Sequence, residues 1–490
     1  MEGGSGRERT TRLALLIALL ILAGTAVVSL ASGEDAPPAA AAAEPSAVAT
    51  TPTTVVAEAA DTSTNSTTAR TTTTTTTTIT TTTTLPPEHK LRLTLVPEDA
   101  AATIETPQGE VQAVASGFEG GLRGPVTVTV EAEGYQTYAE ELDLDADLEH
   151  TIWLDRPGQV LHKVTQWTTA GAPKQVAFNP DSTEVWVTLL NGTGFQVFDP
   201  LDGELIASVE LPEAGSVEVM FNKAGTKGYV SQMETASVYE IDAGSKTVLR
   251  TLDTEAVWTK VMVLSPDEQT LWASNWVSNN VSEFDLATGE VTRKLNTVVT
   301  PRGLYVTPDG KKLYVAGFED GEIEVFDLAT GDSEVIYRSG GSMRHLVGDA
   351  ATGLMYASDM GRAHVLVIDT TTNEVEELAT VDKVPNTIDL SPDGKVLYVS
   401  NRGRNNPETY YKPGPEWGTV VAIDTATGDY LDAIIGGNQT TGLDVSPDGT
   451  LLAFSDFLDN RVTVYRIPSY EELVAGGGGR WEAHLSEIAK

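Results

Sequence analysis

The sequence contains no cysteine. This absence excludes disulfides, thiolate metal sites, cysteine nucleophiles and the lipidated cysteine of a bacterial lipoprotein. Basic residues are also scarce, because 32 Lys and Arg stand against 70 Asp and Glu and give a formal net charge of −38. Duplex nucleic acid and anionic lipid surfaces repel such a chain, so no nucleic-acid partner is expected.

Long hydrophobic runs are absent except at residues 13–31, LALLIALLILAGTAVVSLA. This run approaches the ~20 residues that a helix needs to cross a bilayer. Residues 1–12 carry three arginines and should stay in the cytoplasm. We therefore expect a single-pass signal-anchor in the cell membrane with an exported C-terminal ectodomain. The alternative is a signal peptide cleaved after the small residues 29–31, which would give a secreted protein.

Residues 32–88 consist mainly of Ala, Pro and Thr, with an almost unbroken Thr run near their end. Such a segment has too few apolar residues to bury a core, which predicts a disordered linker. Thr-rich segments with proline are typical of exported stalks. We expect this one to act as a spacer.

Residues 89–157 alternate apolar and polar residues, the period-two pattern of half-buried strands. The pattern predicts a small β domain. Its core GPVTVTVEAEGY, at 124–135, and its acidic alternating exit resemble a PEGA domain. That resemblance implies a surface β-module.

The next three hundred residues repeat. Stretches such as LSPDEQTLWAS, VTPDGKKLYVA and LSPDGKVLYVS recur at steps of 43, 43, 42, 42, 42 and 55 residues. The turn positions that anchor the seven units are Pro180, Lys223, Pro266, Pro308, Ala350, Pro392 and Pro447. Periods of about 40 to 45 residues with several strands each indicate a β-propeller.

Residues 158–468 are therefore predicted to form a seven-bladed β-propeller. The stretch 159–167 has the pattern of a fourth strand but precedes the first full unit, so it should complete the last blade and close the ring. Residues 469–490 are a C-terminal tail, which we expect Trp481 and Leu485 to dock on the outside. The fold class expected for the whole chain is all-β, with a membrane helix and a disordered stalk preceding the two β domains.

The repeat also carries a family resemblance. SPDGKVLYVSN at 391–401 and VVAIDTATGDYLDAIIGGN at 420–438 resemble the YVTN propeller repeat of bacterial and archaeal surface proteins. The resemblance implies an extracytoplasmic propeller that binds or adheres. Propellers similar to YVTN arrays also resemble lactone hydrolases and quinone-dependent dehydrogenases, which keeps an enzyme as the alternative.

Equivalent positions of the units form rings around the channel mouth of a propeller. The ring six residues before the anchors is rich in basic residues, and consists of Lys174, Val217, Lys260, Arg302, Arg344, Asn386 and Thr441. Further candidates follow the second strand on the same face, and are Asn275, Trp276, Asp359, Asn401, Arg402 and Asp456. Cations, amides and aromatic rings together predict a pocket for an anionic ligand. The alternative is structural: the cations pair with Asp359, Asp456 or strand-end carbonyls to close the channel, and the aromatic residues pack between blades.

The sixth unit is lengthened by 13 residues within 401–418, NRGRNNPETYYKPGPEWG, between its second and third strands. Insertions on one face of a repeat array often mark its binding face. We therefore add Tyr410, Tyr411 and Trp417 to the ligand-binding candidates. A surface elaboration without function is the alternative.

Catalytic patterns are missing. The six histidines are scattered, no metal-ligand spacing appears, and neither a G-x-S-x-G elbow nor a P-loop is present. We predict no metal, no cofactor and no catalytic residue, although His345 beside Arg344 would be the one base at the mouth.

The sequence thus favours a membrane-anchored binding protein of the cell envelope. Its propeller face would meet a cell-wall glycan, a surface protein or a small anionic ligand. A propeller enzyme and a structural surface-layer component are the alternatives.

Overall fold

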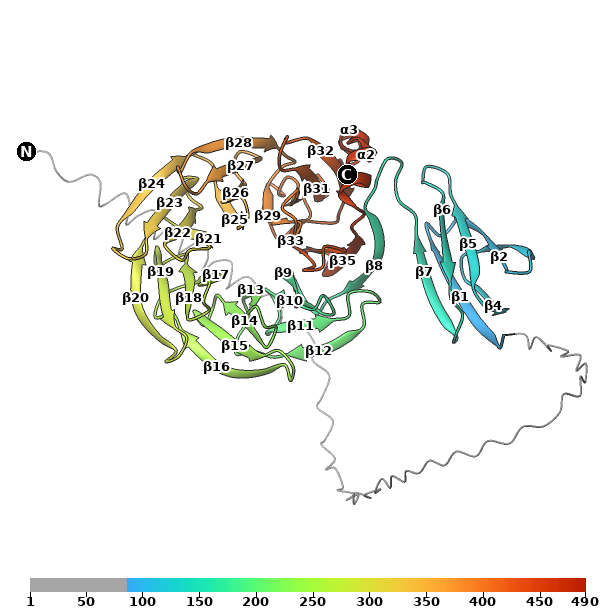
Figure 1. Cartoon of the computed structure of the whole chain (residues 1–490), viewed down its shortest axis with the longest axis horizontal. Helices are drawn as coiled ribbons and strands as arrows, with labels where there is room; N and C mark the ends of the chain where they lie inside the picture. Colours follow the sequence, from blue (N-terminus) through green and yellow to red (C-terminus); the bar gives the residue numbers. More distant parts are fainter. Residues whose placement is uncertain (1–85) are drawn as a thin grey trace, which may run out of the picture. The chain divides into compact units, whose positions relative to one another are not determined.

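The computed structural model describes residues 86–490 (Figure 1). The predicted membrane segment and nearly all of the predicted linker lie outside these residues. Within 86–490, none of the helices has the length and hydropathy needed to span a bilayer. This part of the chain is almost entirely β-sheet, which confirms the all-β prediction for it.

The first seven strands form a small β domain of two sheets. They are β1 (Glu88–Val96), β2 (Ala101–Glu105), β3 (Val111–Ala115), β4 (Phe118–Arg123), β5 (Val126–Glu131), β6 (Tyr138–Leu142) and β7 (Leu148–Trp153). One sheet has the order β4-β1-β7, with β1 and β7 parallel, and the other has the order β3-β2-β5-β6. Alternate residues of β1 and β5, among them Leu93 and Val128, share one core. The PEGA resemblance itself remains a prediction.

Seven four-stranded antiparallel sheets form the propeller. In Figure 1 the innermost strands surround the ring axis, and they are β9 (Pro173–Phe178), β13 (Ser216–Phe221), β17 (Thr259–Leu264), β21 (Pro301–Val306), β25 (Met343–Asp349), β29 (Pro385–Leu390) and β33 (Thr440–Val445). The second strands are β10 (Val185–Leu189), β14 (Lys227–Gln232), β18 (Thr270–Asn275), β22 (Lys312–Gly317), β26 (Leu354–Asp359), β30 (Val396–Asn401) and β34 (Leu451–Asp456).

The two outer strands of each blade complete the sheets. The third strands are β11 (Phe195–Phe198), β15 (Ser237–Asp242), β19 (Asn280–Asp285), β23 (Glu322–Asp327), β27 (His364–Asp369), β31 (Thr419–Asp424) and β35 (Arg461–Arg466). The outermost strands are β12 (Leu205–Val209), β16 (Thr247–Asp253), β20 (Glu290–Asn296), β24 (Ser333–Arg338), β28 (Val375–Thr380), β32 (Tyr430–Ile435) and β8 (His162–Thr168).

The ring closes where the sequence predicts. Strand β8 precedes the first blade in the chain but pairs antiparallel with β35, the third strand of the seventh blade. The two ends of the propeller therefore share one sheet, which closes the ring of blades.

A buried aromatic residue in the second strand joins neighbouring blades. Six blades carry Trp or Tyr at the same position, and these residues are Trp186, Tyr229, Trp272, Tyr314, Tyr356 and Tyr398, each at most 4% exposed. Trp186 of blade 1 packs with Val219 and Tyr239 of blade 2, and Tyr398 of blade 6 packs with Leu443 of blade 7. Aromatic rings bury much apolar area, so this position supplies the core between blades.

A buried hydroxyl near the end of the second strand makes a second link between blades. Ser400 Oγ accepts a hydrogen bond from the N–H of Thr387 in its own blade (3.1 Å) and donates one to the carbonyl of Thr441 in the next blade (2.7 Å). Ser274 makes the same two bonds, to Val261 N–H and to the carbonyl of Arg302. The equivalent positions in the seven blades are Thr188, Ser231, Ser274, Ala316, Ser358, Ser400 and Ser455, all 0% exposed.

The tail after the last blade is helical. Helices α2 (Tyr470–Gly476) and α3 (Gly479–His484) carry it, and Trp481 stacks on Tyr430 with the ring centroids 3.8 Å apart. Leu485 is 48% exposed, so the expectation that it docks the tail is wrong. Buried His484 does so instead, through a 2.8 Å contact between its Nε2 and Asp382 Oδ2.

Ser400→Ala tests the serine link. Removing the hydroxyl leaves a buried N–H and a buried carbonyl without their partner, so we expect unfolding free energy to fall by about 2 kcal/mol. Chemical denaturation measures this change. The control is Ser208→Ala, an exposed position on β12, where a change within about 0.5 kcal/mol is expected. Equal effects of the two changes would contradict the proposed link.

Candidate functional site

The basic ring predicted from the sequence occupies the second residue of each innermost strand. The pairing with the second strand shifts in register at this residue, as between Met343 and His345 on either side of Arg344 in blade 5. Such a bulge redirects side chains. The cations of the ring lie close enough to one another, and to Arg402, to lower one another's pKa. We call these five residues the basic cluster: Lys174, Lys260, Arg302, Arg344 and Arg402.

Two guanidinium groups of the cluster are buried without an ion pair or a hydrogen bond to a carboxylate among residues 86–490. Arg302 is 7% exposed and Arg344 is 3% exposed. Nε of Arg302, and Nε and Nη1 of Arg344, are buried atoms with no hydrogen-bond partner among residues 86–490. A buried cation without a partner is costly, so this arrangement needs a separate explanation.

The structural pairing considered from the sequence is wrong for the two acids it named. Asp359 accepts hydrogen bonds from the backbone N–H groups of Ser342 (2.8 Å) and Gly361 (3.0 Å). Asp456 pairs with Arg461, with Nη2 2.6 Å from Oδ2. Neither carboxylate neutralises the basic cluster.

Because neither carboxylate pairs with the cluster, burial and mutual repulsion lower the pKa values of its cations. Burial is the main cause that lowers the pKa of Lys174, Lys260 and Arg302 well below their usual values, and repulsion from the neighbouring cations adds to it. Burial also lowers the pKa of Arg344 and of Arg402 to about 10. An anion placed among these groups would relieve both effects.

Aromatic rings flank the cluster on the side of blades 3 and 4. Lys260 Nζ lies 4.6 Å and Arg302 Cζ 4.8 Å from the centroid of Trp276. Arg302 Cζ is also 5.4 Å from the centroid of Phe318. Trp276 therefore makes cation–π contacts with Lys260 and Arg302, and it also contacts the aromatic rings of Trp258 and Phe318.

The insertion of blade 6 brings a second aromatic group to the cluster. Tyr410 and Tyr411 lie with their centroids 4.1 Å apart, and Tyr411 is 6.4 Å from Phe457. Arg402 donates to the side chain of Gln439 and lies 5.7 Å from the Tyr410 ring. Tyr410 and Tyr411 remain 42% and 50% exposed, so they are available to a ligand.

Trp417 lies elsewhere in the insertion. The centroid of its ring is 4.4 Å from Lys490 Nζ, and its backbone N–H donates to the carbonyl of Ile488 (2.8 Å). Arg404 pairs with Glu416 at 2.6 Å, which closes the base of the loop. Trp417 thus joins the insertion to the tail, whereas the two tyrosines lie beside the basic cluster.

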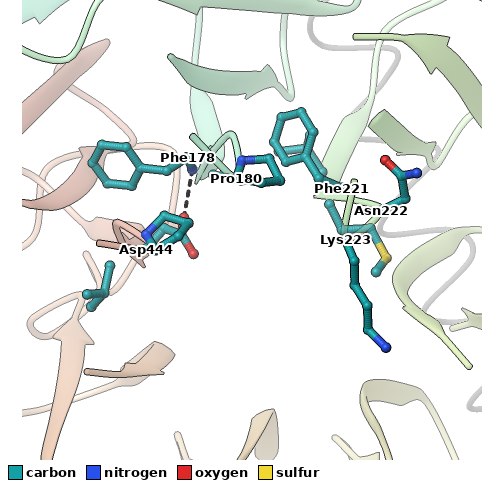
Figure 2. A pocket seen from close by; sticks show the side chains of 11 residues that line it. Phe178, Pro180, Phe221, Asn222, Lys223 and Asp444 are labelled. Atoms are coloured by element: carbon teal, nitrogen blue, oxygen red, sulfur yellow. Dashed lines mark hydrogen bonds between the residues drawn. The ribbon is translucent and has the colours of Figure 1, made fainter. Parts of the chain in front are cut away.

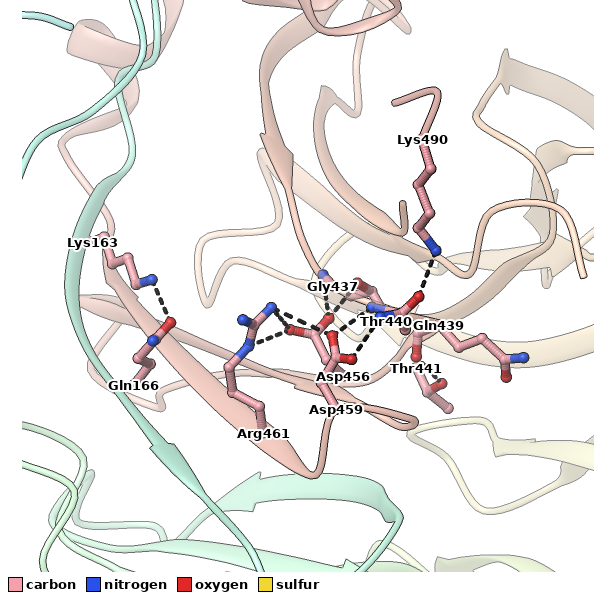
Figure 3. A network of polar contacts seen from close by, with 11 residues as sticks. Lys163, Gln166, Gly437, Gln439, Thr440, Thr441, Asp456, Asp459, Arg461 and Lys490 are labelled. Atoms are coloured by element: carbon pink, nitrogen blue, oxygen red, sulfur yellow. Dashed lines mark hydrogen bonds and ion pairs between the residues drawn. The ribbon is translucent and has the colours of Figure 1, made fainter. Parts of the chain in front are cut away.

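The polar candidates at the end of the second strands belong to the framework. Asn275 is fully buried, accepts from Thr259 Oγ1 and donates to Ser282 Oγ, both at 2.9 Å. Figure 3 shows Asp456 in a similar role, with Arg461, Gly437 and Thr440 around it. Asn401 is also fully buried and donates to the carbonyl of Val399. Asn275 and Asp456 thus bond to Thr259 and Thr440, the residues that directly precede the ring positions of their own blades.

Glu218 is an acid of the site that the sequence did not reveal. It follows the ring position Val217 and is 8% exposed. Burial raises its pKa to about 7, while Arg344, Arg302 and Lys174 act in the opposite direction. The signal was present in the sequence, because the equivalent positions hold Gln175, Val261, Gly303, His345, Thr387 and Gly442 and only blade 2 has an acid.

His345 does not have the properties of a general base. Its Nδ1 lies 3.1 Å from the carbonyl of Ile388 in the next blade, so Nδ1 carries the proton and donates. Burial lowers its pKa to about 3, and the charge of Arg344 acts in the same direction. The ring is neutral at ordinary pH and links blades 5 and 6.

A cavity of about 400 Å³ opens at the other end of the inner strands (Figure 2). Phe178, Phe221 and Pro447 line it, and Asp444 accepts a 2.7 Å hydrogen bond there from the N–H of Phe178. Burial raises the pKa of Asp444 and of its neighbour Asp389. The inner strands therefore carry cations at one end and protonatable carboxyls at the other.

Comparison with known proteins agrees with this fold. The family model described as lactonase, seven-bladed β-propeller, matches residues 210–336. A chain of Kuenenia stuttgartiensis hydrazine synthase superposes with a TM-score of 0.53 over 62% of this chain and 98% of its own, at 19% identity. This likeness concerns the fold alone. The predicted β-propeller is confirmed, whereas the assignment to YVTN repeats remains a prediction.

A curated relative identifies the family. Antigen Lp49 of Leptospira interrogans is 34% identical over 355 residues, which cover 70% of this chain and 77% of the antigen. The chain belongs to the antigen Lp49 family. In this member of the Lp49 family, four of the seven innermost strands carry Lys or Arg at their second position, beside two groups of aromatic rings.

Arg344→Met distinguishes a binding role from a structural one in this Lp49 family member. Replacing a buried, unpaired charge by an apolar side chain of similar length should raise unfolding free energy by about 1 to 3 kcal/mol. Thermal and chemical unfolding measure the change. As the matched control, Arg461→Met breaks a real ion pair and should lower stability by about 2 kcal/mol. A destabilised Arg344→Met would show that the fold needs this guanidinium.

Proposed function

We propose that this protein is an exported binding protein of the cell envelope whose basic cluster takes up an anionic ligand. The observation that carries the proposal is the burial of Arg302 and Arg344 without a partner among residues 86–490. In a chain with a net charge of −38, acids are plentiful, yet none of residues 86–490 forms an ion pair with these two groups, and burial raises the pKa of their acidic neighbour Glu218 to about 7. An anion from outside the chain would supply the missing charge.

The rest of the sequence supports a position at the cell surface. Residues 13–31 would anchor the chain in the membrane, and the Thr-rich linker would hold the β domains away from it. The relative Lp49 is described as an antigen, a term that suits a surface-exposed protein. The partners we propose are a cell-wall glycan, a surface protein or a small anionic ligand. If the signal is cleaved, the same protein is secreted.

The double change Arg302→Ala with Arg344→Ala tests the role of the cluster. We expect binding of the full-length chain to cell-wall fractions and anionic glycans to weaken at least tenfold, because two charge-assisted contacts are lost. Arg250→Ala with Arg293→Ala is the control, since it removes the same charge from arginines that pair with Glu240 and Glu283 away from the cluster. Unchanged binding in the cluster variant would refute the proposal.

Tyr410→Ala with Tyr411→Ala tests the insertion. Both rings are partly exposed beside Arg402, so their removal should weaken binding roughly tenfold and leave thermal stability nearly unchanged. Tyr470→Ala is the matched control, because this tyrosine bonds to Asp424 beside the tail. Equal affinities of all three proteins would assign the insertion to surface elaboration.

A lactone hydrolase is the second candidate, favoured by the match of residues 210–336 to the lactonase propeller family. Turnover of lactones by the full-length chain, abolished in the Arg302→Ala with Arg344→Ala variant, would show that the protein is an enzyme and not only a binding protein. The same preparation should be analysed for bound metal.

A further inference from the structure

We infer that the ligand of the basic cluster is a sugar acid: a singly charged carboxylate on a hydroxylated ring, either free or at the end of a glycan. This inference rests on the proposed function and specifies its ligand. The groups in the cluster that lack partners determine which chemistry the ligand must supply.

The cations specify a carboxylate. Nε and Nη1 of Arg344 have no hydrogen-bond partner among residues 86–490, so this guanidinium keeps N–H donors for carboxylate oxygens. The free Nε of Arg302 supplies a further donor. Glu218 shares this space, and its own negative charge disfavours a doubly charged phosphate more strongly than a carboxylate.

Two neutral requirements point to hydroxyl groups. Asn386 is fully buried, yet both its Nδ2 and its Oδ1 lack a hydrogen-bond partner among residues 86–490. A ligand that satisfies Asn386 must both accept and donate a hydrogen bond. The buried carboxyl of Glu218 also needs a polar partner. A sugar hydroxyl meets both needs, whereas an apolar acid would leave these groups unsatisfied.

The flanking rings suit the apolar face of a sugar. Trp276 and Phe318 lie beside Arg302, and Tyr410 and Tyr411 lie beside Arg402. The face of an aromatic ring is apolar and packs well against an apolar ligand face. Such rings therefore favour a ligand that is apolar on its face and polar at its edge. A pyranose ring with a carboxylate has this distribution.

Calorimetric titration of the full-length chain with four small probes tests the inference. Glucuronate has the charge and the hydroxyls, glucose lacks the charge, cyclohexanecarboxylate lacks the hydroxyls, and glucose 6-phosphate carries the higher charge. We expect glucuronate to bind at least tenfold more tightly than each of the others. An oligosaccharide ending in glucuronate distinguishes the sources, because tighter binding than the free acid indicates a glycan end and equal binding indicates a free sugar acid.

Two variants separate charge from hydroxyl recognition. Arg344→Met should weaken the binding of both glucuronate and cyclohexanecarboxylate at least tenfold. Glu218→Val, which introduces the residue found at the equivalent position Val261, should reduce the preference for glucuronate over cyclohexanecarboxylate about fivefold or more without loss of the fold.

The outcomes separate this inference from the proposed function. Equal binding of glucuronate and cyclohexanecarboxylate, both lost in Arg344→Met, would overturn the sugar-acid inference and leave an anion-binding protein. Tighter binding of glucose 6-phosphate would also overturn it. Failure of every probe would overturn it as well, and the wall-fraction experiment would then decide the proposed function by itself.

Discussion

The architecture of the site depends on a buried hydroxyl that recurs near the end of the second strand in six of the seven blades. Ser274 and Ser400 each accept the N–H that the bulge of the innermost strand leaves free, and each donates to a carbonyl of the next blade. That carbonyl belongs to the ring residue itself, Arg302 in one case and Thr441 in the other. The bond that joins two blades therefore also fixes the backbone from which the ring side chain extends.

Blade 4 departs from this pattern. Ala316 stands there in place of the serine. It has no hydroxyl to donate to the carbonyl of Arg344, the ring residue of the next blade. The guanidinium of Arg344 has free Nε and Nη1, while the groups around it are cations and one buried acid, Glu218. Blades 3 to 5 thus concentrate the basic residues, and blades 6 and 7 supply Asn386, Thr441 and the insertion.

The insertion and the tail form one unit on the last blades. Glu416 forms a β-bridge with Ala489, and Trp417 bonds to Ile488, so the end of the described chain supports the base of the loop. Asp382 accepts from both Thr419, just after the insertion, and His484 of the tail. This support leaves the two tyrosines beside the cluster while the base of the loop is anchored.

The sequence by itself determined the all-β class, the number of blades, the closing strand, the ring positions and the place of the insertion, because strand periodicity and turn residues are local and the repeat displays them seven times. Tertiary structure alone decided what each polar residue contacts. It placed Asn275 and Asp456 in the framework and made His345 a link between blades. It also left nitrogen atoms of Arg302 and Arg344 without hydrogen-bond partners and brought Glu218 near them. Several of these partners are distant in the chain, as His345 and Ile388 are in neighbouring blades and the tail residue His484 lies 102 residues from Asp382, so no local pattern could assign them.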